Sequence, residues 1–188
     1  MSLLRPLSKL PDINAASVLL VENEEHFQQK LADVMVNEKS VMVKVRLAKS
    51  LPLPAKNEQN RPRIDLVVFI INLMSDLSLQ SAEASLKHLG QGYFLGKVCF
   101  MVTNARNAAL PAERMVAVRK LASGLRCPLL YAEDQTPDGV TNAAERLLVI
   151  LRVAAGCVPM TTALFLSNLT RCIVPTEEEE QQNLDFDA

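Results

Sequence analysis

Short runs of apolar residues alternate along the chain with segments in which apolar residues return every three or four positions. Four runs are almost continuously apolar, as strands are when helices cover both faces of a parallel sheet. They lie at residues 17–21, 65–71, 97–102 and 128–131. A fifth run, 41–47, alternates apolar and polar side chains, which predicts a half-exposed strand at an edge of the sheet. An antiparallel direction is open for this strand.

Helical periodicity occupies the intervals between these strands. In each of four segments the apolar residues fall on one face of a helix. The segments cover residues 27–35, 79–89, 115–125 and 140–151, and Thr136-Pro137-Asp138 is a start signal for the last. The alternation predicts an α/β fold, a three-layer doubly wound sandwich.

Length and composition fit one domain with a sizeable core, since the 188 residues are 49% hydrophobic and 22% charged. We expect this domain to cover residues 1–174. An additional short helix is expected near 160–173, after the Gly156…Pro159 break, with apolar residues on more than one face. Residues 175–188 include four consecutive glutamates and are expected to form an acidic, disordered tail.

Net charge and the lack of targeting signals indicate which classes of partner to expect. A net charge of −1 argues against direct nucleic-acid binding, which needs a clustered basic face. No apolar run approaches the roughly 18 residues of a membrane span, and the first residues lack a signal-peptide core, so we expect an intracellular protein without a membrane partner. The cysteines are too far apart in sequence for a metal site and are expected to be reduced and buried: Cys99, Cys127, Cys157 and Cys172.

The turn after the first strand is where doubly wound folds bind phosphate, and here it carries acidic residues. A P-loop reads G-x-x-x-x-G-K-[ST], because backbone amides must wrap the phosphates and a lysine must reach them. Residues 22–29 read ENEEHFQQ, so Glu22 and Phe27 replace the two glycines and Gln28 replaces the lysine. Acidic residues also suit the first turn of a helix, and we favour that reading over a cation site.

Two further elements of a GTPase are missing. The first glycine is Gly90, so no earlier loop has the residue that lets backbone approach a phosphate, and no D-x-x-G follows an early strand. Where GTPases read the base with N-K-x-D, this chain has Thr103-Asn104-Ala105-Arg106. The chain also lacks G-x-S-x-G and H-E-x-x-H motifs. We therefore predict no nucleotide, no metal, no cofactor and no enzymatic activity.

Two other interpretations stay open. The first strand and its acidic turn are similar to a response-regulator receiver, but the phosphoacceptor aspartate would fall at Ile70, so a receiver-like domain would be degenerate and act as a protein-binding module. The other is a divergent but active GTPase, which guanine-nucleotide binding would reveal.

Several longer strings resemble the centromere protein M family. They are LRPL at 4–7, LAKSLPLP at 47–54, RPRIDL at 61–66, FLGKVCF at 94–100 and PLLY at 128–131. The resemblance covers nearly all of the chain except the tail. It implies a small-GTPase-like fold, of P-loop NTPase type, that neither binds nor hydrolyses GTP. It further implies a nuclear, non-catalytic subunit of the inner kinetochore, in the constitutive centromere-associated network at the centromere. There it would support centromere protein I directly, in a complex with centromere proteins H and K, and so serve chromosome segregation in mitosis.

A scaffold needs an apolar surface that its own core does not use. One candidate is the stretch 92–96, where apolar Phe94 and Leu95 lie between glycines, although these residues suit a plug over the core equally well. The second is the additional helix, with Leu164 and Phe165. We expect Phe94, Leu95, Leu164 and Phe165 to contribute to a docking surface for centromere protein I.

Overall fold

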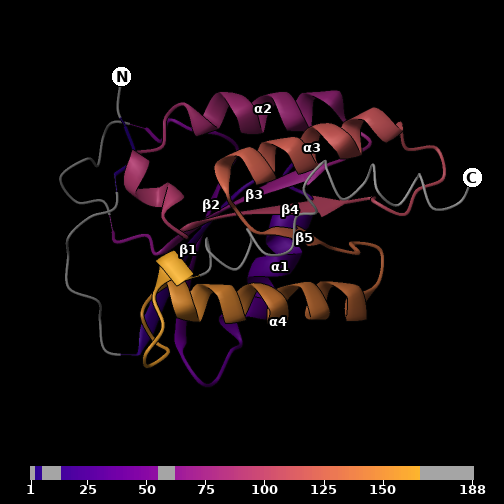
Figure 1. Cartoon of the computed structure of the whole chain (residues 1–188). Helices are drawn as coiled ribbons and strands as arrows, with labels where there is room; N and C mark the ends of the chain where they lie inside the picture. The colour runs from indigo at the N-terminus through magenta and orange to yellow at the C-terminus, as the bar shows by residue number, and fades with distance from the viewer. Residues whose placement is uncertain (1–2, 6–13, 55–61, 166–188) are drawn as a thin grey trace, which may run out of the picture.

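Five parallel strands form the centre of the molecule in a computed structural model that describes residues 3–5, 14–54 and 62–165 (Figure 1). Within these residues the strands are β1 (Ala15–Val21), β2 (Met42–Ala48), β3 (Leu66–Asn72), β4 (Val98–Thr103) and β5 (Leu129–Tyr131). Their order across the sheet is β2-β1-β3-β4-β5, and each neighbouring pair is parallel. The predicted α/β sandwich with a parallel sheet is confirmed.

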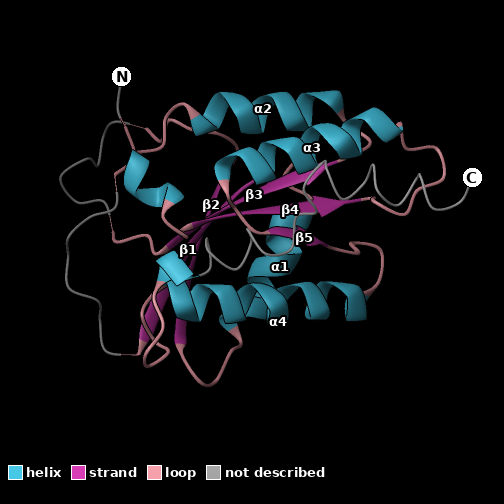
Figure 2. Cartoon of the chain, in the orientation of Figure 1, coloured by secondary structure: helices cyan, strands magenta, loops and turns pink. Residues whose placement is uncertain are grey.

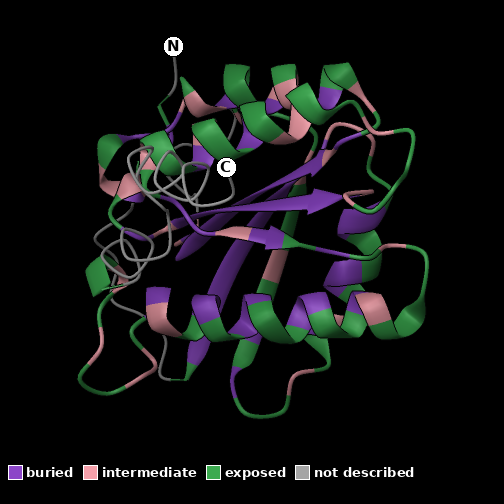
Figure 3. Cartoon of the chain, turned by 45° about the vertical axis from the view of Figure 1, so that its right-hand side comes forward, coloured by how far each residue is buried: buried purple, intermediate pink, exposed green. Residues whose placement is uncertain are grey.

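Two pairs of helices cover the two faces of the sheet (Figure 2). The helices α1 (Phe27–Val36) and α4 (Pro137–Ala154) lie on one face, and α2 (Asp76–Leu86) and α3 (Ala112–Leu125) on the other. Along β1, Val18 and Leu20 belong to the core beneath α1 and α4, whereas Leu19 and Val21 belong to the core beneath α2 and α3. Because both faces are buried, the inner strands read as continuous apolar runs (Figure 3).

The edge strand β2 runs parallel to β1, so the antiparallel direction left open by its pattern is wrong. Alternation along a strand reports which face is exposed and carries no information about direction. Direction follows from the connection, because α1 crosses over the sheet between β1 and β2 and such a crossover joins parallel strands. The predicted half-exposure is confirmed, since Val43 is 8% and Met42 is 63% exposed.

Helix starts follow the predicted signals in part. Thr136 caps α4, accepting a hydrogen bond from the Gly139 amide at 3.1 Å, as its sequence indicates. Ser78, which directly precedes the predicted segment 79–89, lies inside α2 and accepts a hydrogen bond from the Asn72 amide, and Ser75 occupies the cap position without a side-chain bond. The stretch before β4 forms a short 3-10 helix, η2 (Gln91–Phe94).

The C-terminal predictions are only partly covered. A helical turn begins at residues 163–165, and the remainder of the additional helix expected near 160–173 lies outside the described residues. The tail expected at 175–188 lies outside them as well. No helix in the described part of the chain is both long and apolar enough to span a bilayer.

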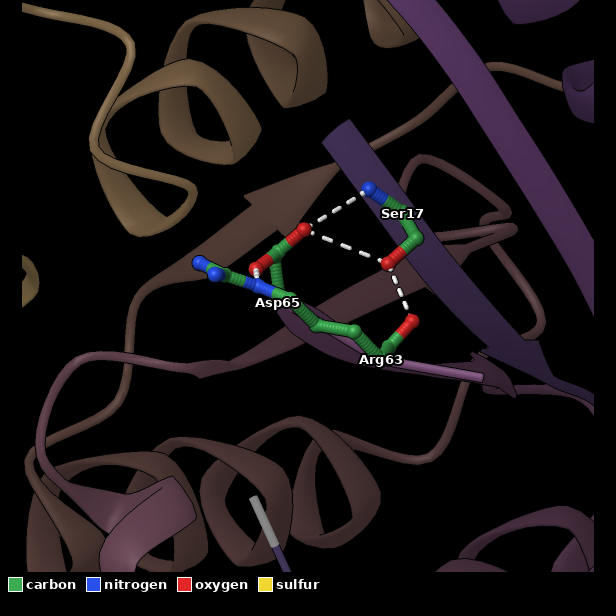
Figure 4. A network of polar contacts seen from close by, with 3 residues as sticks. All are labelled: Ser17, Arg63 and Asp65. Atoms are coloured by element: carbon green, nitrogen blue, oxygen red, sulfur yellow. Dashed lines mark hydrogen bonds and ion pairs between the residues drawn. The ribbon is translucent and has the colours of Figure 1, made fainter. Parts of the chain in front are cut away.

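A buried charge holds β1 and β3 together near their amino ends (Figure 4). Asp65, 2% exposed, accepts hydrogen bonds from the Ser17 amide at 2.9 Å and from the Ser17 hydroxyl at 3.2 Å, and it pairs with the Arg63 guanidinium. Burial raises the pKa of the Tyr93 hydroxyl, and the Asp65 charge adds to that rise. Burial also lowers the pKa of Lys97, although Asp65 opposes that shift. This end of the sheet is therefore fixed by ionic contacts as well as by apolar packing.

Candidate functional site

The turn between β1 and α1, where a phosphate would bind, is filled by the chain's own Glu22. Its side chain is 3% exposed and points back at the start of α1. One carboxylate oxygen accepts hydrogen bonds from the backbone amides of Phe27 at 2.9 Å and Gln28 at 2.8 Å, and the other oxygen lies 3.2 Å from the Phe27 amide. These are the first free amides of α1, the groups that bind phosphate in folds of this kind. An internal anion therefore occupies the anion position.

Two opposing effects set the ionisation of Glu22. Burial removes the carboxylate from water and raises its pKa, and this is the larger effect. The amides of Gln28 and Phe27 favour the charged form and lower the pKa, without overcoming burial. The pKa of Glu22 is therefore raised above its ordinary value, and the helix start holds this anion at an electrostatic cost.

The other two glutamates of the turn point to separate partners. Glu24 accepts a hydrogen bond from the Asn72 amide group at 2.8 Å, and Asn72 in turn accepts one from Asn104 at 3.0 Å. This chain of contacts links the carboxyl ends of β1, β3 and β4. Glu25 forms an ion pair with Lys49 at 2.9 Å. Because the carboxylates diverge, they form no cation site, and the described residues contain no cluster of three or more His, Cys, Asp or Glu side chains fit for a metal ion.

The backbone of this turn also differs from a phosphate-binding loop. Glu25 has a φ of 56°, in the left-handed region where glycine is the residue without steric cost. The turn therefore has a Cβ at Glu25 and a carboxylate at Glu22 where a phosphate-binding loop has bare backbone. Sequence reasoning found the missing glycines, but it did not anticipate that Glu22 would turn inward.

Among the residues that the structure describes, two cavities border the carboxyl ends of the strands. The smaller, of about 230 Å³, is bordered by Glu22, Glu24 and Lys30 among others and falls below the roughly 300 Å³ at which ligand pockets begin. The larger, of about 580 Å³, lies beyond the ends of β4 and β5 and is bordered by Asn104, Arg106, Glu133, Asn142 and Arg146 among others. We call it the β4–β5 cavity. Its lining carries both signs of charge.

The predicted docking residues lie at the opposite, amino end of the sheet. Leu95 is 57% exposed, and Leu164 and Phe165 are each 51% exposed. Phe94 is half-buried and packs against the core beneath α2 and α3, so it belongs to the exposed surface only in part. Tyr93, 1% exposed, is the residue of this stretch that plugs the core.

The structure brings these two segments, far apart in sequence, into direct contact. A Cβ placed on Gly96 would lie 1.7 Å from the carbonyl oxygen of Ala163, so the backbones of the two segments touch at this glycine. The φ of Gly96 is 82°, which L side chains rarely adopt. Leu95 and the 163–165 turn therefore form one surface, which we call the amino-end patch and define as Leu95, Leu164 and Phe165.

The cysteines show no reactive arrangement among the described residues. Cys99 and Cys127 are buried and Cys157 is partly exposed, all three as free thiols, and Cys172 lies outside the described residues. Burial raises the pKa of the Cys99 thiol and raises that of Cys127 to about 12. These two thiols therefore stay protonated and unreactive at neutral pH.

Comparison with known proteins identifies the family of this chain. The family model described as Centromere protein M (CENP-M) matches residues 1–173. The chain belongs to the centromere protein M family. It is 58% identical over 182 residues to Centromere protein M of Danio rerio, across 96% of this chain and 98% of that protein.

More distant members match over similar lengths. Centromere protein M of Homo sapiens is 46% identical over 172 residues, which cover 91% of this chain and 94% of that protein. Centromere protein M of Xenopus laevis is 42% identical over 179 residues, which cover 95% and 99%. The family resemblance seen in five sequence strings is thus confirmed over nearly the whole chain. The match includes the β1–α1 turn and the residues of the amino-end patch.

Proposed function

We propose that this protein is a non-catalytic interaction subunit of the inner kinetochore, in the constitutive centromere-associated network. Its fold serves as a small-GTPase-like scaffold, a pseudo-GTPase that neither binds nor hydrolyses GTP. It works in the nucleus, at the centromere, and supports centromere protein I directly and centromere proteins H and K in the same complex, in chromosome segregation at mitosis. Membership of the centromere protein M family supports the location.

The proposed lack of nucleotide binding rests on one observation. The Glu22 carboxylate accepts hydrogen bonds from the first amides of α1. A phosphate at this position would have to displace a covalently attached anion, which is always present at high effective concentration. It would also meet the charges of Glu24 and Glu25 nearby. The strand order supports a doubly wound fold in general, since receiver domains share it. A working receiver has no support, because Ile70, where the phosphoacceptor would stand, is 2% exposed within the core.

Isothermal titration calorimetry with Mg·GTP and with GDP tests the first half of this proposal. We expect no saturable heat from the full chain with either nucleotide. Saturable binding in the micromolar range would overturn the pseudo-GTPase assignment and favour a divergent GTPase.

The second half concerns the amino-end patch as the docking surface for centromere protein I. Its three apolar side chains are more than half exposed, and they come from two segments whose backbones meet at Gly96 and Ala163. Well-packed apolar anchors of this kind supply most of the binding energy in protein interfaces. We expect Leu95→Asp and Leu164→Asp to abolish co-purification with the complex of centromere proteins I, H and K.

Exposed apolar residues elsewhere give matched controls for this experiment. Leu77 on α2 and Val149 on α4 are 68% and 63% exposed, and Leu77→Asp and Val149→Asp should leave co-purification unchanged. The melting temperature of all four variants should stay near that of the unsubstituted chain, because none of these side chains is buried. Unfolding of the Leu95→Asp and Leu164→Asp chains would show that they are core residues, and equal loss in the controls would show that the effect is not local.

A further inference from the structure

Of the ten prolines in the full sequence, a single one follows a serine or threonine. This is Pro137, after Thr136. Proline-directed protein kinases require this dipeptide. Their pocket for the residue after the phosphoacceptor favours proline, which has no backbone N–H. The chain therefore offers these enzymes one site.

Thr136 is exposed and has an extended backbone, as a kinase substrate requires. The residue is exposed, as are Gln135 before it and Pro137 after it. Its φ of −116° and ψ of 143° are extended, as expected for a residue that precedes proline. Protein kinases bind their substrates as extended chain, so the backbone of Thr136 itself already has the required conformation.

A carboxylate lies next to this hydroxyl, and an arginine lies on the other side of that carboxylate. The Thr136 hydroxyl lies 3.4 Å from one oxygen of Glu133, and the other oxygen of Glu133 lies 3.9 Å from the Arg106 guanidinium. Glu133 thus bridges Thr136 and Arg106 at the rim of the β4–β5 cavity. The Arg106 side chain is 95% exposed, so it can change partner without disturbing the core.

A phosphate on Thr136 would compete with Glu133 for that arginine. Phosphothreonine carries a charge of about −1.5 to −2 and three acceptor oxygens, and it binds arginine more strongly than a carboxylate does. The negative charge of the phosphate is repelled by the carboxylates of Glu133, Asp134 and Asp138. The position of the phosphate therefore depends on its attraction to the Arg106 guanidinium. The Gly139 amide, which now donates to the Thr136 hydroxyl, can donate to a phosphate oxygen instead.

We propose that Thr136 is a phosphoacceptor for a proline-directed protein kinase, and that its phosphate takes Arg106 from Glu133. In this reaction the Thr136 hydroxyl oxygen forms a bond to the γ-phosphorus of Mg·ATP and the bond between that phosphorus and the bridging oxygen breaks. ADP leaves, and the hydroxyl proton passes to the kinase's base. The modification goes beyond the scaffold function, because it adds a regulatory charge at the carboxyl end of the sheet, away from the amino-end patch.

The first test incubates the full chain with a purified cyclin-dependent kinase, its cyclin and Mg·ATP, and follows intact mass. We expect one phosphate per chain, located on Thr136 by peptide mapping. Thr136→Ala should abolish incorporation. Pro137→Ala is the sharper control, because it keeps the hydroxyl and the helix cap and removes only the kinase determinant, so the rate should fall at least about tenfold. No incorporation, incorporation at another residue, or an unchanged rate in the Pro137→Ala chain would overturn the assignment.

The second test measures the exchange of Arg106. The second pKa of the phosphate, followed by phosphorus NMR, should be lower in the phosphorylated chain than in its phosphorylated Arg106→Gln variant, because the guanidinium favours the dianion. Arg119→Gln, a substitution of an arginine that contacts Tyr131 instead, should leave this pKa unchanged. Equal phosphate pKa values with and without Arg106 would refute the exchange while leaving the phosphorylation itself intact.

Discussion

The inward Glu22 carboxylate allows a quantitative test of the proposal that an internal anion takes the place of a phosphate in the β1–α1 turn. We consider Glu22→Ala, which removes the internal anion, and Glu22→Gln, which keeps its shape and one acceptor oxygen but removes the charge. In the alanine variant the amides of Phe27 and Gln28 lose their acceptor within a buried turn.

The magnitude follows from those two amides. Each buried donor left without a partner costs about 1–3 kcal/mol, and loss of a negative charge at a helix start costs about 0.3–1 kcal/mol more. Water entering the emptied turn and relief from burying a charge reduce the total. We expect Glu22→Ala to lower the free energy of unfolding by about 2–4 kcal/mol. Glu22→Gln should stay within about 1 kcal/mol of the original chain at neutral pH, because a carbonyl oxygen still accepts a bond.

The pH dependence separates the charge from the shape. The pKa of Glu22 is raised in the folded state, so the folded chain keeps this proton to a higher pH than the unfolded chain does. Stability therefore falls as pH rises from the ordinary value of 4.5 through the raised folded pKa. We would measure urea unfolding of the original chain and of Glu22→Gln at pH values from 4.5 upward. The original chain should lose stability relative to Glu22→Gln as the pH rises. A relative gain with rising pH would mean that the amides outweigh burial.

A small carboxylate should restore the alanine variant. If Glu22 acts as a bound anion, formate can enter the vacated position and stabilise Glu22→Ala by about 1.4 kcal/mol at ten times its dissociation constant. Chloride at equal ionic strength serves as the control, and the original chain should respond equally to both salts. The reasoning would be refuted by a loss of less than about 0.5 kcal/mol in Glu22→Ala, or by equal responses of that variant to formate and chloride.

Three further outcomes are expected. Asp65→Ala should lower the free energy of unfolding by about 2–4 kcal/mol in urea, because it removes the carboxylate that pairs with Arg63 and accepts from the Ser17 amide; a loss under about 1 kcal/mol would contradict this. Gly96→Ala should destabilise by at least about 1–2 kcal/mol and raise hydrogen exchange at residues 163–165, whereas Gly124→Ala, with open space around it in α3, should be neutral or stabilising by about 0.5–1 kcal/mol; equal effects would refute the close contact. Cys99 and Cys127 should react with iodoacetamide at pH 8 only as fast as the chain opens, so modification at the rate of a free thiol would show that they are accessible.

Much of the fold could be predicted from the sequence because two-sided burial leaves a strong signal. The strands β1, β3 and β4 differ from their predicted bounds by at most two residues, since their apolar runs end where packing ends. The direction of β2 could not be predicted from its alternation, because the pattern of a half-exposed strand is the same whichever way it runs. Helix α2 covers Asp76–Leu86 and therefore begins and ends earlier than the predicted segment 79–89, with Ser78 in its first turn bonded to the end of β3.

The sequence predicted which residues of a phosphate-binding loop are missing, but it did not predict how the side chains of the β1–α1 turn are arranged. The missing glycines of the β1–α1 turn are visible in the letters of the sequence. That Glu22 reaches the amides of α1 depends on the left-handed backbone at Glu25, a conformation that sequence alone does not favour for glutamate. The contact of Gly96 with Ala163 joins segments separated by β4, α3, β5 and α4, and no local pattern encodes such a contact.

The internal anion and the amino-end patch are best understood together. A nucleotide-dependent switch moves because the loops around its phosphate have different contacts with and without the ligand. Here the corresponding turn is closed by Glu22, and the contacts from Glu24 through Asn72 to Asn104 link the ends of three strands. If Glu22 keeps this position filled, as proposed, no ligand binds at this end to shift the conformation. The docking surface proposed for assembly needs no such switching, and the exposed Leu95 and Leu164 lie at the other end of the sheet.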